Sequence, residues 1–419
     1  MFYKINFLLA ILFATITIQA QESLSLNDCY KAAEKNYPQQ AKKELLDTQL
    51  ALEQEVLATQ KLPKFDLGAQ ATYQSDVVSL PISIPNMDIE SLSQEQWKAT
   101  LTASQLIYNG GLIDLQKNIN EATSNAKQQE IDVQFHQIKS QINQLYFSVL
   151  LIDQTKTVLQ KNIEQLQDKI SEIESRIKHG VAPENATESL QVKVLELQQK
   201  TTEINATRQQ LVDKLGLVIG QNISKTTQLN VPEIFMSEHQ NKRPEIALFD
   251  LQKEVISQNA NLLSKKNYPK ISAFGTGGVG NPGLNILDNA TQEFYIVGAK
   301  LQWNVFDWNA NKKQCQALAI NKDIIDNQQD VFEWLQTITA NAYVAEIEKY
   351  QSLLKIDDEL ITLHKKIVAT ASKQLKHDII TTADYTAEIN KLLTAEINQK
   401  EHKIELALAK ANYQVTMFN

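Results

Sequence analysis

The sequence predicts a mainly α-helical protein with a small β part, built as a duplicated unit of long coiled-coil helices. Three observations support this fold class. Sequence features recur at fixed offsets, apolar residues follow helical spacing over long segments, and short segments alternate apolar and polar side chains. Each copy is expected to contain a first helix, two strands, a very long helix, a sharp turn and a returning helix.

The duplication is indicated by matched residues in the two halves of the chain. Two proline pairs are separated by one offset, and two later pairs share a second, smaller offset. The pairs are Pro38 with Pro244, Pro63 with Pro269, Tyr108 with Phe306, and His179 with His377. Because the offset changes between Pro63 and Tyr108, the first copy is expected to have the longer loop there.

These offsets predict the domain organisation. The first repeat is expected over 21–220, a linker over 221–241, and the second repeat over 242–419. The predicted elements are strands at about 64–74, 96–106, 270–280 and 294–305, and helical hairpins over 110–218 and 309–415.

The segment 1–20 has the pattern of a secretory signal peptide. Lys4 precedes an apolar run, and Ala20 supplies a small residue before the expected cleavage. Polar neighbours make Cys29 a poor lipid-attachment site. No apolar run of about 18 residues follows the signal, so no transmembrane helix is expected.

The long helices carry apolar seams. In the first copy, apolar residues recur at spacings of three and four over 131–177, which predicts a coiled-coil seam about 70 Å long. Only Lys156 interrupts that series. The returning helix, 190–218, has a matching seam with Thr201 and Arg208 as polar breaks.

The four predicted strands alternate in a way that suits a membrane. Each is about 10 residues long with aromatic residues near its ends, which is typical of a tilted strand that crosses a bilayer. Four strands cannot close a membrane barrel, which needs about eight, so subunits would have to share one. A half-buried strand of a soluble sheet would look similar. The alternative is therefore a soluble periplasmic coiled-coil adaptor or scaffold.

A G-x-G-x-x-G pattern at Gly275, Gly277 and Gly280 raises the question of a dinucleotide-binding loop. Such a loop requires a helix that begins at the third glycine. The turn sequence Asn281-Pro282-Gly283 follows instead. We therefore expect these glycines at the end of a strand and in its hairpin loop.

Other functional classes find little support. A net charge of −8 without a basic block argues against a nucleic-acid surface. The six histidines include no H-E-x-x-H motif, and Cys29 and Cys315 suit neither a disulfide framework nor a metal knuckle. We expect no enzyme, no cofactor and no metal site.

Several motifs of the two copies together suggest a known family. They are NYP and KRPEI near helix starts, LPKF and YPKI before strands, QLIYNGG and WNVFDWN after strands, and KHG-x-A at the first helix turn. With these motifs, nearly all of the chain after the signal resembles the TolC family of outer-membrane efflux proteins. One departure is Trp308-Asn309 at the second strand-to-helix junction, where the first has Gly110-Gly111.

The resemblance implies a homotrimer in the outer membrane. Each protomer would give four transmembrane strands to a 12-stranded barrel held in outer-membrane lipid, with a helical tunnel in the periplasm. The channel would export small molecules or ions passively, as the exit duct of a tripartite efflux or type I secretion system. Its partners would be a periplasmic adaptor (membrane fusion) protein and an inner-membrane pump or ABC exporter.

The resemblance also implies that the helix-hairpin tips dock the adaptor. The corresponding residues here are Gly180, Val181, Ala182, Asp378, Ile379 and Ile380. The two tips differ, because Gly180 of the first corresponds to Asp378 of the second.

In a three-fold tunnel, each acid near a tip is repeated around one axis. A ring of carboxylates can form a cation-preferring constriction, and Asp378 and Asp384 are the candidate aperture acids. The other interpretation is that these acids are ordinary helix-start carboxylates. Similarly, His179 and His377 could form a metal ring or be solvated turn residues.

Overall fold

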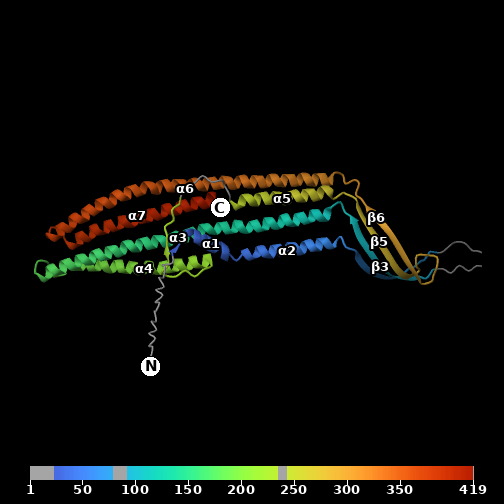
Figure 1. Cartoon of the computed structure of the whole chain (residues 1–419), viewed down its shortest axis with the longest axis horizontal. Helices are drawn as coiled ribbons and strands as arrows, with labels where there is room; N and C mark the ends of the chain where they lie inside the picture. The colour runs from blue at the N-terminus through green and yellow to red at the C-terminus, as the bar shows by residue number, and fades with distance from the viewer. Residues whose placement is uncertain (1–22, 79–91, 235–242, 419) are drawn as a thin grey trace, which may run out of the picture. The chain divides into compact units, whose positions relative to one another are not determined.

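The computed structural model describes residues 23–78, 92–234 and 243–418, and it is mostly helical (Figure 1). The expected signal peptide lies outside these residues. The helices are α1 (Leu26–Asn36), α2 (Gln40–Thr59), α3 (Leu112–Lys178), α4 (Glu188–Ile219), α5 (Pro244–Lys265), α6 (Ala310–Lys376) and α7 (Thr382–Met417). Among the described residues, no helix has a stretch that is both apolar enough and long enough to cross a bilayer.

The duplication is visible in the lengths of the elements. Helices α3 and α6 each have 67 residues, about 100 Å at 1.5 Å per residue. The strands are β1 (Ser23–Leu24), β2 (Lys64–Tyr73), β3 (Glu95–Tyr108), β4 (Gln228–Leu229), β5 (Lys270–Asn281) and β6 (Gln292–Gln302). The connection from β2 to β3 is longer than that from β5 to β6, as the offsets predict.

The chain forms two compact units, and each takes residues from both repeats. Unit 1 comprises Met1–Tyr37, Phe135–Asn241 and Gln336–Asn419, and unit 2 comprises Pro38–Gln134 and Lys242–Leu335. The compact units therefore do not follow the repeat boundaries. Helices α3 and α6 contribute to both.

Unit 2 contains a four-stranded antiparallel sheet in the order β2-β3-β5-β6. Leu67 pairs with Leu101, Leu101 with Gly277, and Gly277 with Tyr295, so these four residues form one row across the sheet. The side chains of Leu67 and Tyr295 are 82% and 78% exposed. The sheet thus carries an apolar face that the described residues leave uncovered.

The opposite face of the sheet is more polar. Thr102 pairs with Asp66 and with Thr276, and the two threonine hydroxyl oxygens lie 3.0 Å apart. The different character of the two faces follows from the period-2 alternation of the strands.

The glycines of the G-x-G-x-x-G pattern all lie in strand β5 after Phe274, so their expected place at the end of a strand is confirmed and their expected place in the hairpin loop was wrong. Gly278, which lies between two of these glycines in β5, has the closest surroundings: a Cβ there would lie 2.6 Å from the Ala99 carbonyl oxygen and 2.9 Å from the Phe294 ring. A Cβ at Gly298 would similarly lie 3.0 Å from the Phe274 ring. Glycine is needed where an aromatic ring crosses a neighbouring strand.

The first core of unit 1 joins α3 to α1, α4 and α7. Tyr146, Leu215 and Cys29 are fully buried, which agrees with Cys29 not being a lipid-attachment site. The Tyr146 hydroxyl lies 2.9 Å from the Leu24 carbonyl oxygen and 2.7 Å from that of Asn230. These contacts fix the parallel β1–β4 pair to α3.

A second core of unit 1 confirms the predicted seam between α3 and α4. Leu159, Leu166 and Ile173 of α3 are buried in one cluster with Leu190 and Val194 of α4, together with residues of α6 and α7. The seam therefore serves as the packing surface of a four-helix arrangement.

The two strand-to-helix junctions have the same backbone conformation despite different residues. Gly110 and Gly111 have φ of 71° and 79°, and Trp308 and Asn309 have φ of 55° and 60°. The predicted departure at this site therefore leaves the turn unchanged.

We expect Gly278→Ala to destabilise the sheet and Gly277→Ala to be tolerated. The methyl group at Gly278 would meet backbone and ring atoms, whereas a Cβ at Gly277 meets nothing within 4 Å. Overpacking of this kind costs about 1–3 kcal/mol. Thermal unfolding followed by circular dichroism would measure the difference, and equal midpoints for the two variants would contradict the close approach at Gly278.

Candidate functional site

The first helix-hairpin tip ends α3 with a Schellman motif. The Gly180 N–H donates to the Ile177 carbonyl at 2.9 Å, and the Val181 N–H donates to the Arg176 carbonyl at 3.0 Å. Gly180 has φ of 72°, the left-handed conformation that this motif requires. The turn then leads through Pro183 into a short 3₁₀ segment, Glu184–Thr187, before α4.

The second tip has the same geometry with an aspartate in place of the glycine. The Asp378 N–H donates to the Leu375 carbonyl at 3.1 Å, and the Ile379 N–H donates to the Gln374 carbonyl at 2.9 Å. Asp378 has φ of 58°. Aspartate is among the few non-glycine residues that adopt this conformation readily, so the tip turns are equivalent in spite of the sequence difference.

Arg176 joins the two tips, and the sequence analysis did not predict this. Its Nη2 donates to both carboxylate oxygens of Asp378, at 2.9 Å and 3.0 Å. It also reaches the Val181 carbonyl, while Nη1 reaches the Leu375 carbonyl, both at 3.3 Å. The only sign of this contact in the sequence was the presence of a basic residue in the last turn of α3.

This ion pair contributes more to the position of the Asp378 carboxylate than to the stability of the fold. The Asp378 side chain is 64% exposed and that of Arg176 is 19% exposed. Exposed pairs contribute about 0–1 kcal/mol. The contacts nevertheless fix the direction of the Asp378 carboxylate and partly neutralise it.

Asp384 is held by the start of its own helix. The Asp384 N–H donates to the Thr381 hydroxyl at 3.1 Å, while the Thr381 N–H and hydroxyl donate to the Asp384 carboxylate at 3.0 Å and 2.7 Å. This capping box lowers the pKa of Asp384, mainly through the Thr381 hydroxyl and then through its backbone N–H. The helix-start interpretation therefore accounts for Asp384.

The tips present apolar side chains to solvent at corresponding positions. Val181 and Ile379 each follow the left-handed residue and are 58% and 67% exposed. In a Schellman motif this position often packs on its own helix. Ala182 is half-buried, and Ile380 packs against the second core. Val181 and Ile379 are thus the two apolar groups best placed for an external contact.

The tip histidines give no sign of a metal centre. The His179 Nδ1 lies 2.7 Å from the Ser175 carbonyl oxygen, so the ring caps the end of α3. His377 is exposed at the end of α6. No group of three or more potential metal ligands lies together anywhere in the described part of the chain.

Comparisons with known proteins give a family and a fold. Residues 45–218 match the family model described as outer membrane efflux protein. None of the curated proteins compared with the chain matches it.

Solved structures with the same fold cover almost the whole chain. The outer membrane protein VceC of Vibrio cholerae has 13% identity and a TM-score of 0.62, over 93% of this chain and 95% of its own. The MtrE outer membrane channel of Neisseria gonorrhoeae has 13% identity and a TM-score of 0.64, over 94% and 88%. CusC has 11% identity and a TM-score of 0.67, over 94% and 92%.

Residues 45–218 are therefore similar to the outer membrane efflux protein family, and solved outer-membrane channels share the fold of nearly the whole chain.

Proposed function

We propose that three copies of this chain form a channel that acts as the exit duct of a tripartite efflux or type I secretion system. The observation that carries the proposal is the sheet of unit 2, whose two edges and apolar face the described residues leave open. A bilayer would cover that face, and neighbouring copies would pair with the edges. Transport is passive, because an open duct needs no energy source of its own.

The strand directions allow a closed ring. Since each neighbouring pair in the order β2-β3-β5-β6 is antiparallel, β2 and β6 run in opposite directions. Pairing β6 of one copy with β2 of the next therefore continues the antiparallel pattern. Three copies of four strands would give a 12-stranded barrel, within the range known for membrane barrels.

Helices attached to the two edge strands carry exposed apolar rows. Helix α2, which leads into β2, exposes Leu45, Leu52 and Val56, and α6, which follows β6, exposes Ile320 and Ile324. Two different surfaces at opposite edges suit a heterologous contact, which closes into a ring when the rotation permits. The helices thus support the same assembly as the strands.

We expect the protein purified in mild detergent to be a trimer. Separation would expose the backbone groups of two strand edges, at a cost of several kcal/mol for each group left unpaired in an apolar medium. Light scattering coupled to size-exclusion chromatography would give the mass of the protein after the mass of the bound detergent is subtracted. A monodisperse monomer would end the shared-barrel proposal.

The alternative, a soluble periplasmic adaptor or scaffold, is disfavoured by the apolar face of the sheet. Leu67 and Tyr295 lie on that face almost fully exposed. Soluble monomers rarely leave a contiguous apolar face uncovered. An adaptor would be released with the soluble periplasm, whereas a channel stays with the membrane until detergent is added.

The hairpin tips are the proposed docking sites for a periplasmic adaptor, which an inner-membrane pump or ABC exporter would feed. Support comes from the equivalent turns at Gly180 and Asp378 and from the exposure of Val181 and Ile379. Asp378 is also the better candidate for an aperture acid, since its carboxylate stays largely exposed beside Arg176. Asp384 is a weaker candidate because its carboxylate caps α7.

Gly180→Val is expected to impair export without preventing assembly. A β-branched residue in the left-handed conformation costs about 1–2 kcal/mol, and that strain is local because a Cβ at Gly180 meets no atom within 4 Å. The matched control is Gly180→Asn, because asparagine adopts this conformation more readily. Both variants are compared with wild type by the accumulation of a compound that a strain lacking the gene retains.

Assembly is monitored in the same cells. Cysteine placed at Ala290, in the connection between β5 and β6, is labelled on intact cells with an impermeant reagent. Equal labelling shows that each variant reaches the membrane. If Gly180→Val assembles and exports at the wild-type rate, the docking role of this tip is refuted and Gly180 is only a helix terminator.

A further inference from the structure

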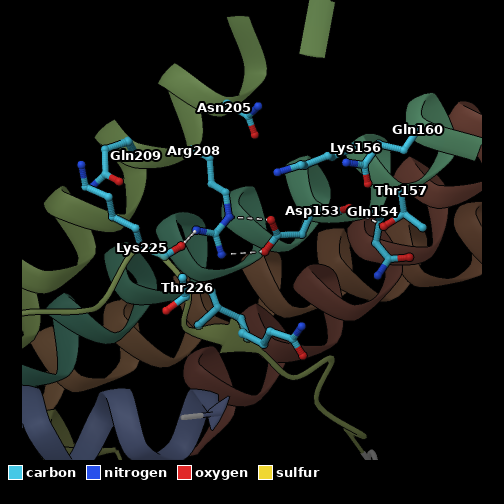
Figure 2. Close-up of a pocket in the computed structure, with 12 residues that line it drawn as sticks. Asp153, Gln154, Lys156, Thr157, Gln160, Asn205, Arg208, Gln209, Lys225 and Thr226 are labelled. Carbon is cyan, nitrogen blue, oxygen red and sulfur yellow. Dashed lines mark hydrogen bonds and ion pairs between the residues drawn. The ribbon is translucent and has the colours of Figure 1, made fainter. Parts of the chain in front are cut away.

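A polar pocket interrupts the seam between α3 and α4 in unit 1. It has a volume of about 620 Å³ and is lined by residues of both helices and by the segment 225–229 (Figure 2). Two residues that break the apolar periodicity, Lys156 and Arg208, both line it. The seam breaks therefore mark a place where polar residues of the two helices line an open pocket.

Arg208 forms part of the wall of this pocket and connects the segments that line it. Its Nε and Nη2 donate to the two carboxylate oxygens of Asp153, at 2.5 Å and 3.1 Å. Its Nη1 donates to the Lys225 carbonyl at 2.8 Å, and Nη2 donates to the Thr227 carbonyl at 2.9 Å. These four bonds tie α3, α4 and the linker segment together, so the pocket is preformed.

The pocket retains positive charge after this pairing. The only carboxylate among its lining residues is that of Asp153, which Arg208 neutralises. Lys156 is half-buried, and Figure 2 shows it extending toward Arg208. Neither its ammonium nor that of Lys225 has an ion-pair partner among the described residues.

The rest of the lining is polar and uncharged. Gln154, Gln160, Asn205 and Gln228 supply amides, and Thr157 supplies a hydroxyl. Amides both donate and accept hydrogen bonds. Such a lining suits a ligand with several hydroxyl or amide groups rather than an apolar one.

We propose that this pocket binds a small polar molecule that carries a carboxylate or phosphate group. The two ammonium groups would hold the anion, and the amides would contact the polar remainder of the molecule. The volume lies within the range of about 300–1,000 Å³ that is usual for small-molecule sites. This site is separate from the proposed docking tips, so its test is independent of export.

The test uses the full-length protein in mild detergent at low salt. Three probes share a sugar ring: glucose 6-phosphate, glucuronate and neutral glucose. Saturation-transfer difference NMR titrations measure the affinity of each. We expect binding of one or both anions with dissociation constants at least about tenfold below that of glucose, because a hydrogen bond to a charged group contributes about 1.5–3 kcal/mol. The stronger anion identifies phosphate or carboxylate as the preferred group.

The lysines are tested by the double variant Lys156→Gln with Lys225→Gln. It should weaken anion binding by at least about tenfold and leave the mass of the particle unchanged. The control is Lys214→Gln, an exposed lysine of α4 outside the pocket lining, which should bind as wild type does. Equal affinity for glucose and the anions, no binding of any probe, or unchanged binding in the double variant would each overturn the proposal.

Discussion

Unpaired backbone groups at the edges of the sheet are the constraint on which the rest of the structure depends. Strands β2 and β6 have 10 and 11 residues, and among the described residues each has a neighbouring strand on only one side. An edge strand in water can be protected by charge or solvent, but an edge in lipid has no such solution. The sheet is therefore an incomplete unit that further strands must complete, whereas helices supply the cores of unit 1.

The repeats preserve backbone conformation more strictly than side-chain identity. A left-handed residue ends both long helices, although one is Gly180 and the other Asp378. Asp378 tolerates this conformation through its short polar side chain, and Arg176 of the other hairpin holds its carboxylate. The asymmetry between the tips thus gives one contact that two glycines could not make.

Periodicity made the elements predictable from the sequence. Alternation and seam spacing depend on neighbouring residues, so the strands and the paired long helices could be derived without tertiary information. The error at Gly275–Gly280 arose because glycine is usually read as a turn signal. In β5, glycines such as Gly278 instead make room for an aromatic ring of the adjacent strand, which only the pairing register reveals.

The candidate site was less predictable, because its contacts join distant segments. Arg176 and Asp378 are 202 residues apart. Nothing local connects them. Arg208 was visible as a polar break in the seam, but its partners include the carbonyls of Lys225 and Thr227, in a segment expected to be a linker. The periodicity of the sequence could locate the polar break at Arg208, but it could not identify the residues that Arg208 contacts.

The two seam breaks differ in what the fold gains from them. Burial of a leucine at either position would contribute about 1.5–3 kcal/mol to the stability of the fold. A polar residue there lacks that contribution. Arg208 compensates, because its four hydrogen bonds fasten the linker segment to two helices. Lys156 has no comparable contact among the described residues, although Arg208 neutralises the nearest carboxylate in the pocket. Hydrogen bonds within the chain explain Arg208, whereas the proposed anion would explain Lys156.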